Sequence, residues 1–181
     1  MLQPMVWITP RWRTRCFLAF AALALVLVYV MAQVGARLIN ESVPQGIISF
    51  ELAESLEASL AIQVAWGEKG RQYAALSLGL DYFFLLVYGL ALSLACVCFA
   101  AWGEDDSRLA RLMPWLPLAA ATMDALENYA LIRLLFGEVR GGWVLLARDS
   151  ALIKFALLAL VALYLLYALA LVLRVRWLSL R

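Results

Sequence analysis

Apolar residues follow one another in long blocks along this chain, and polar residues gather in shorter stretches between the blocks. Each of four blocks holds about 20 mostly apolar residues, enough to cross about 30 Å of hydrocarbon at a helical rise of about 1.5 Å per residue. The pattern therefore predicts four transmembrane helices. They cover approximately residues 16–35, 75–102, 113–136 and 150–173.

The segment from residue 46 to residue 66 has a different, amphipathic pattern. Its apolar residues recur every fourth position, and glutamates stand on the other side, as expected for a helix along the extracytoplasmic membrane surface. Two interpretations stay open: the glutamates are solvated, or the helix is a lid that turns Glu51 or Glu54 toward a cavity. The apolar positions are Ile48, Leu52, Leu56 and Leu60, and the glutamates are Glu51, Glu54 and Glu57.

Composition places the chain among integral membrane proteins. Hydrophobic residues make up 66% of its 181 residues, charged residues make up 15%, and the mean hydropathy is +0.87. A water-soluble domain of this length cannot bury so much apolar surface, whereas a bilayer accommodates it. We therefore predict an all-α fold: a four-helix transmembrane bundle with an additional amphipathic helix, in a single membrane domain over residues 1–181.

The positions of the arginines predict the orientation. Many of them flank the predicted spans on one side, which should be the cytoplasmic side because positive residues are retained there. Both termini are then cytoplasmic, in the inner membrane of a bacterium. The net charge of +2 marks membrane topology and not a nucleic-acid partner. The cytoplasmic arginines are Arg11, Arg13, Arg15, Arg108, Arg111, Arg174, Arg176 and Arg181.

The first block has an alternative interpretation as a secretory signal. Three arginines, an apolar stretch and the small residues Val34, Gly35 and Ala36 also fit a signal with a cleavage site. About 20 apolar residues is long for a signal core, which favours a retained span. Cleavage would leave three spans in the same orientation.

Charged residues inside the predicted spans are the main candidates for function. Counting from the cytoplasmic edge places Asp81, Arg133 and Lys154 near the outer boundary of the hydrocarbon, with Asp124 and Glu127 about one to three helical turns deeper. A charge facing lipid at mid-depth costs on the order of 3 kcal/mol, so these side chains should face one another.

Helical spacing brings the deeper polar residues to one face. Asp124, Glu127 and Asn128 are three and four positions apart and form one stripe, while Asp81 and Lys154 stand on neighbouring spans. We expect a polar pocket in the outer half of the bundle. With Arg133 included, it holds three acids and two bases, a formal charge of −1 that a proton or a bound cation would balance.

The predicted function is to bind a small cation, a proton or a polar lipid headgroup in this pocket. Asp124 and Glu127 would form its acidic floor, Asp81 its rim, Lys154 the counter-charge, and Asn128 an orienting amide. In the competing interpretation, the protein is an accessory or assembly subunit whose charges only lock the helices together. A homo-oligomer or a membrane complex is compatible with either role.

A third interpretation is a carboxylate-dependent enzyme that acts on lipid headgroups. Acidic residues and Asn128 could hold a hard cation such as Mg²⁺ through oxygen ligands, although Lys154 would compete with it. The chain has no histidine, which excludes histidine-based triads and histidine-ligated metals. The sequence thus favours a binding protein over an enzyme, predicts no cofactor and does not identify a metal.

Several phrases resemble an uncharacterised group of small bacterial four-span membrane proteins. These are GIISFELAESLEASLAIQVAW, LGLDYFFLLVYGLALSLAC, MDALENYALIRLL and SALIKF. The resemblance covers most of residues 46–165. It implies the same four spans and draws attention to Glu51 and to the polar residues of the spans, but it implies no activity.

Overall fold

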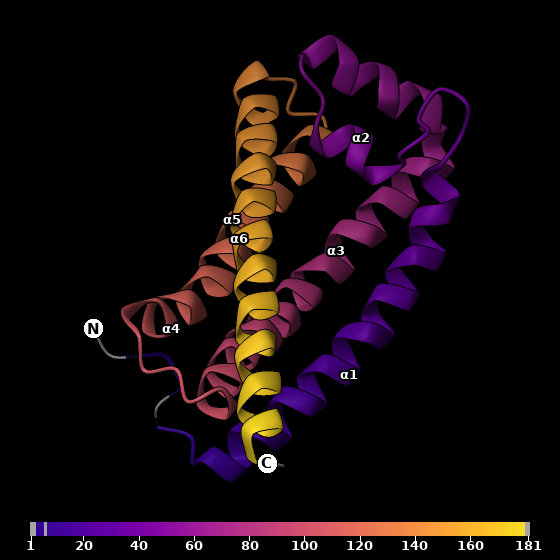
Figure 1. Ribbon diagram of the computed structural model, residues 1–181. Coiled ribbons are helices and arrows are strands. Elements are labelled where there is room, and N and C mark those ends of the chain that lie inside the picture. The colour runs from indigo at the N-terminus through magenta and orange to yellow at the C-terminus, as the bar shows by residue number, and fades with distance from the viewer. Residues whose placement is uncertain (1–2, 6, 180–181) are drawn as a thin grey trace. The chain divides into compact units, whose positions relative to one another are not determined.

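A computed structural model describes residues 3–5 and 7–179 of the chain, so the predicted cytoplasmic Arg181 lies outside it. Figure 1 shows that the described elements are helices, which confirms the all-α class. They are α1 (Pro10–Gly35), η1 (Ala36–Leu38), α2 (Ile47–Glu51), α3 (Leu56–Trp102), α4 (Arg108–Leu112), η2 (Met113–Trp115), α5 (Leu116–Leu135) and α6 (Gly141–Ser179).

Three of the described helices are long and apolar enough to cross a membrane. They are Pro10–Leu38, which joins α1 to η1, then Leu56–Trp102 and Gly141–Ser179. Each contains one of the blocks predicted as a span, and each continues beyond it. The predicted span at residues 113–136 corresponds to η2 and α5. It is not among the three, because every stretch of 18 residues in α5 contains three charges, Asp124, Glu127 and Arg133.

The chain divides into two compact units, and α1, α3, α5 and α6 each contribute to both. Unit 1 comprises Met1–Ala24, Leu86–Ala121 and Phe155–Arg181, and unit 2 comprises Leu25–Leu85 and Thr122–Lys154. The described part of unit 1 holds seven arginines and three acids, whereas unit 2 holds seven bases and ten acids. The predicted single membrane domain stays a prediction.

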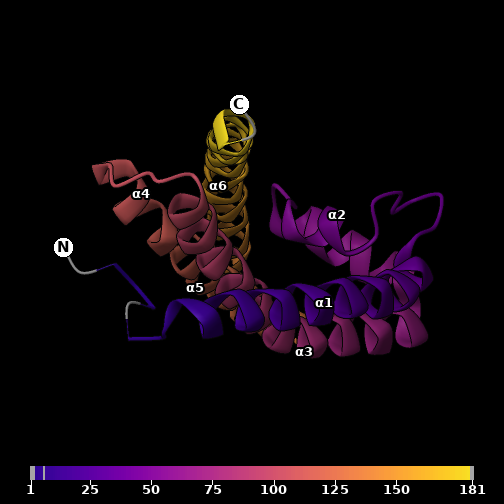
Figure 2. The same ribbon diagram turned by 60° about the horizontal axis from the view of Figure 1, so that its bottom comes forward.

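In unit 1 the start of α1 lies beside the end of α3, as Figures 1 and 2 show. The ring of Phe17 meets the rings of Phe99 and Trp102 edge-on, with centroids 6.3 and 6.4 Å away. Gly89 on α3 permits a second close approach, since a Cβ there would lie 3.1 Å from the Cβ of Ala121 on α5. The core of this unit contains Cys96, Ala100, Ala110, Val161, Tyr164 and Ala168.

Unit 2 contains the segment for which a single amphipathic helix was predicted at residues 46–66. The structure has two helices there, because α2 ends at Glu51 and α3 begins at Leu56. The hydroxyl of Ser55 accepts a hydrogen bond from the N–H of Ala58 at 3.1 Å and so caps the start of α3. Because the apolar positions keep their four-residue period across Ser55, the sequence pattern did not indicate a helix start at this residue.

α2 packs onto the first part of α3 through aromatic residues. Phe50 at the end of α2 is buried and meets Trp66 edge-on at 5.3 Å between ring centroids. The indole N–H of Trp66 donates to the carbonyl of Leu38 at 2.8 Å. These contacts fix α2 and the beginning of α3 inside the hydrophobic core of unit 2, which also includes Val43 and Leu131.

A sharp bend at Gly67 separates this first part of α3 from its long apolar part, and the change in direction is visible in Figure 1. Gly67 has φ +63° and ψ −169°, a conformation that is essentially restricted to glycine. The bend lets residues 56–66 pack over the core of unit 2 instead of extending the long apolar part of the helix.

Replacing Gly67 by alanine should therefore destabilise the protein. Forcing a side chain into this conformation costs about 1–3 kcal/mol, and a lower melting temperature in detergent would reveal it. Gly79→Ala is the matched control, because Gly79 is helical and a Cβ there meets no atom within 4 Å. This control should keep or raise the melting temperature, and an equal loss in both variants would contradict the proposed strain.

Candidate functional site

Six polar residues from four helices come together in the interior of unit 2, and we call them the acidic cluster. α2 contributes Glu51, α3 contributes Asp81, α5 contributes three residues and α6 contributes Lys154. Glu127, Asn128, Asp124 and Lys154 are buried, with residue exposures of 0%, 2%, 3% and 7%. The complete cluster is Glu51, Asp81, Asp124, Glu127, Asn128 and Lys154.

Lys154 is the centre of the acidic cluster. Its Nζ lies 2.7 Å from Oε2 of Glu127 and 3.0 Å from Oδ1 of Asp124, and it donates a hydrogen bond to Asp124. A third carboxylate oxygen, Oε2 of Glu51, lies 3.9 Å away. One ammonium group therefore attracts carboxylates from α2 and α5 at once.

A second set of bonds joins α3 to α5. The amide of Asn128 donates a hydrogen bond to Oδ2 of Asp81, which holds that carboxylate against α5. One residue later on α3, the hydroxyl of Tyr82 donates to the carbonyl of Ala125 at 3.3 Å. These two bonds connect neighbouring residues of α3 to α5.

The stripe on α5 has the geometry expected from its spacing. Asp124, Glu127 and Asn128 are separated by three and four residues and so project from one side of the helix. Leu131 continues this side and is fully buried in the core of unit 2. The opposite side carries exposed residues, among them Leu126 and Tyr129.

Glu51 and Glu54, the two candidate lid residues, have different surroundings. Glu51 ends α2 with only 12% of its side chain exposed, because the neighbouring Phe50 anchors the helix in the core. Glu54, in the turn between α2 and α3, is exposed. The structure therefore brings only Glu51 to the acidic cluster.

The environment of the Glu51 carboxyl group favours its protonated form. Burial raises its pKa from the ordinary value of 4.5, while the positive charge of Lys154 lowers it by less. The negative charge of Asp124 also raises this pKa. Glu51 is therefore a position at which the acidic cluster can hold a proton.

Arg133, the second base expected near the pocket, lies outside the acidic cluster. Its guanidinium forms an ion pair with Glu138 and stands 5.7 Å from the ring centres of both Tyr129 and Trp143. About 40% of its side chain is exposed. With Arg133 excluded and Glu51 included, four acids and one lysine give the cluster a formal charge of −3 instead of the predicted −1.

Two further buried polar residues were not among the predicted site residues. Ser59 and Gln63 lie one turn apart in the first part of α3, with residue exposures of 0% and 7%. Within the described part of the chain, Oγ of Ser59 and Nε2 of Gln63 have no hydrogen-bond partner. Their four-residue spacing on an otherwise apolar face is the sequence signal that could have identified them.

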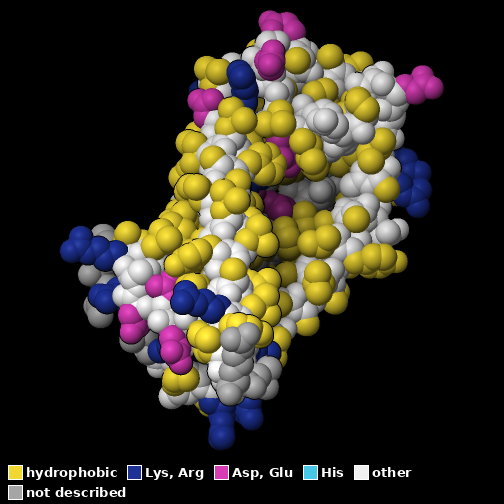
Figure 3. Space-filling model, in the orientation of Figure 1, with side chains coloured by type: hydrophobic (Ala, Val, Ile, Leu, Met, Phe, Trp, Pro, Cys, Tyr) yellow, Lys and Arg dark blue, Asp and Glu magenta, His cyan; other side chains and the backbone are white. Residues whose placement is uncertain are grey.

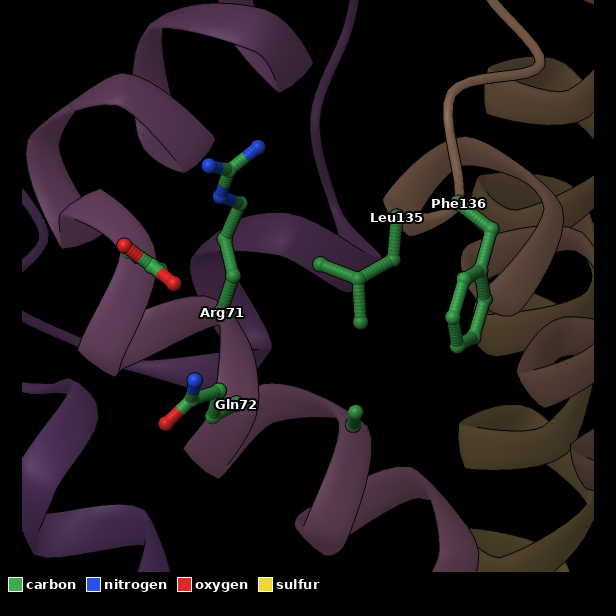
Figure 4. Close-up of a pocket in the computed structure, with 6 residues that line it drawn as sticks. Arg71, Gln72, Leu135 and Phe136 are labelled. Atoms are coloured by element: carbon green, nitrogen blue, oxygen red, sulfur yellow. The ribbon is translucent and has the colours of Figure 1, made fainter.

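The acidic cluster does not line the pocket drawn in Figure 4. That pocket has a volume of about 220 Å³ and is lined by Arg71 and Gln72 on α3 and by Leu135 and Phe136 at the end of α5. Figure 3 shows acidic side chains below α2, recessed among hydrophobic ones. Among the described residues, no group of three or more histidine, cysteine, aspartate or glutamate side chains has an arrangement that would hold a metal ion.

Comparison with known proteins gives no further assignment for this site, because no protein-family model, curated protein or solved structure matches the chain.

Removing the lysine tests whether the acidic cluster depends on it. Lys154→Met leaves buried carboxylates without their counter-charge, so it should cost about 3–5 kcal/mol and greatly lower the detergent melting temperature. Arg133→Met is the matched control, since its ion pair is partly exposed and should contribute only about 0–1 kcal/mol. Equal effects of the two substitutions would show that Lys154 is not the central counter-charge.

The raised pKa of Glu51 predicts a specific pH dependence of stability. Above 4.5 the unfolded chain releases this proton while the folded protein retains it, so stability should fall as the pH rises toward the raised pKa. Glu51→Gln mimics the protonated acid and should flatten this part of the curve of melting temperature against pH. Glu54→Gln, on an exposed side chain, should leave the curve as in the wild type; an unchanged curve in Glu51→Gln would contradict the assignment.

Proposed function

We propose that this chain is a small four-span membrane protein whose acidic cluster binds a proton. The observation that carries the proposal is the gathering of four carboxyl groups around one ammonium group in the interior of unit 2, with Nζ of Lys154 2.7 Å from Glu127, 3.0 Å from Asp124 and 3.9 Å from Glu51. The formal charge of −3 makes proton uptake favourable in an apolar interior.

The exposed surfaces of the long helices support a membrane location. Only 6% of the most apolar stretch of α1 and 22% of that of α6 is buried in the protein. Leu18, Leu25 and Val26 on α1 and Leu163 and Leu166 on α6 are among the exposed side chains. Side chains of this kind are stable against lipid tails and would be costly in water.

α5 would serve as the fourth span despite its three charged residues. Asp124 and Glu127 are buried against Lys154, so they would not be presented to lipid. Arg133 near the end of the helix would reach the membrane surface by snorkelling. The outward residues, such as Leu126, are the ones that acyl chains would contact.

The arginine positions support an orientation in which both ends of the chain are cytoplasmic, in a bacterial inner membrane. The arginines of unit 1 outnumber its acids by seven to three among the described residues. An excess of positive charge near the ends of spans is characteristic of cytoplasmic segments.

The roles of the side chains follow from their contacts. Lys154 holds Asp124 and Glu127 by ion pairs and keeps them from repelling one another. Glu51, which arrives on α2 from the segment between two spans, would carry the proton beside the other acids of the cluster. Asn128 holds Asp81 by its amide, so this carboxylate is stabilised without a second positive charge.

The size of the bound species is limited by the packing of the cluster. Glu127, Asp124 and Asn128 are almost completely buried, and the direct contacts with Lys154 occupy the space between the carboxylates. A proton fits between two carboxyl groups without moving them, whereas a lipid headgroup would have to displace α2. These features favour a proton over the headgroup that the sequence left open.

A second candidate function is that of a subunit in which the same contacts only lock the helices together. The observation that favours it is that the bonds of Lys154 and Asn128 join α2, α3, α5 and α6 in unit 2. Buried ion networks of this type serve in some proteins to specify which helices pair.

Glu127→Gln separates the two functions. Its amide has the shape of the carboxyl group and an oxygen that can face Lys154, so under proton binding the fold should persist. Potentiometric titration of the purified protein should then lose one proton released above the normal glutamate range. Glu138→Gln, on the partly exposed acid paired with Arg133, is the control and should retain that proton.

Two results would contradict proton binding. If wild type and Glu127→Gln release the same number of protons, and Glu127→Gln melts at a much lower temperature, the locking function is favoured. If Na⁺, K⁺ or Mg²⁺ at constant ionic strength raises the wild-type melting temperature while pH does not, the cluster is an ion site.

A further inference from the structure

A cavity in unit 1 combines basic and apolar surfaces and is separate from the acidic cluster. It has a volume of about 280 Å³ and lies between the first turns of α1 and the last turns of α3. Its lining contains two arginines and no acidic residue, so its charge favours an anion. The lining residues are Pro10, Arg11, Arg13, Thr14, Val97, Cys98, Ala101 and Trp102.

The two arginines are placed differently at this cavity. Arg11 is exposed, while Arg13 is half-buried and its Nε donates to the carbonyl of Ile8 at 2.7 Å. The bond to Ile8 restricts the guanidinium of Arg13, which reduces the conformational entropy lost when an anion binds. Guanidinium groups pair with phosphate oxygens through two parallel hydrogen bonds, so a phosphate fits this lining.

The surroundings of the cavity are those of a membrane interface. Trp7, Trp12 and Trp102 are 83%, 57% and 37% exposed, and tryptophan gathers at the level of lipid headgroups. The guanidinium of Arg15 stands 5.3 Å from the ring centre of Trp12. About two turns into α1 the exposed Leu18 begins an apolar face along which an acyl chain could lie.

We infer that this cavity binds the phosphate group of an anionic phospholipid. The arginines supply the recognition of phosphate, whereas Val97, Ala101 and Trp102 supply an apolar wall that a free phosphate ion would not use. The excess of arginine in unit 1 attracts anionic lipids to the same region. This inference requires only that the chain lies in a membrane and does not depend on the proton in the acidic cluster.

The test is lipid binding by the purified full-length protein, measured by native mass spectrometry with phosphatidylglycerol and phosphatidylcholine. Wild type should bind phosphatidylglycerol more tightly than phosphatidylcholine. Arg11→Gln should weaken phosphatidylglycerol binding about tenfold, which is the effect expected from the loss of one charged hydrogen bond. Arg108→Gln removes the same charge from an exposed residue of unit 1 outside the cavity, so its binding should change less than twofold.

A second variant tests the cavity without changing its charge. Ala101→Phe places a larger side chain on the exposed wall of the cavity and should also weaken phosphatidylglycerol binding. This variant keeps the inference testable if Arg11→Gln does not fold. Equal binding of the two lipids, or equal effects of Arg11→Gln and Arg108→Gln, would overturn the inference. Displacement of phosphatidylglycerol by an equal concentration of inorganic phosphate would show a free-phosphate site and overturn the lipid assignment.

Discussion

The interaction on which unit 2 depends is the contact between one buried ammonium group and several buried carboxylates. Lys154 lies within 3.0 Å of both Asp124 and Glu127, in a chain whose other interior residues are mostly apolar. A lone charge in such surroundings is strongly destabilising, so these groups persist only together. The lysine explains why two acids stand on α5, and α5 in turn supplies the amide of Asn128 that holds Asp81.

The same constraint accounts for α2. This helix has only five residues, too few to be stable alone, and is held by Phe50 packed on Trp66. Its last residue, Glu51, places a carboxylate oxygen 3.9 Å from the ammonium group of Lys154. A short helix outside the long apolar segments therefore brings a fourth carboxyl group to the acidic cluster.

The sequence predicted the parts of this arrangement that depend on periodicity. Residue spacing was sufficient to place Asp124, Glu127 and Asn128 on one face and to associate Asp81 and Lys154 with them. It could not separate Glu51 from Glu54, because that choice depends on the break at residues 52–55 and on the cap at Ser55. Nor could it show that Arg133 turns to Glu138 and two aromatic rings, since the side-chain direction depends on the turn after α5 and on the packing of Trp143 from α6.

If the account is correct, each unit holds a binding site of its own: arginines line a surface cavity in unit 1, and one of the buried carboxyl groups of unit 2 carries a proton. The most direct measurement of the central claim is the infrared spectrum of the protein in lipid at neutral pH. A protonated carboxyl band should be present in the wild type and absent from the double variant Glu51→Gln, Glu127→Gln. A wild-type spectrum in which every carboxyl group is ionised, or a band unchanged in the double variant, would contradict the account.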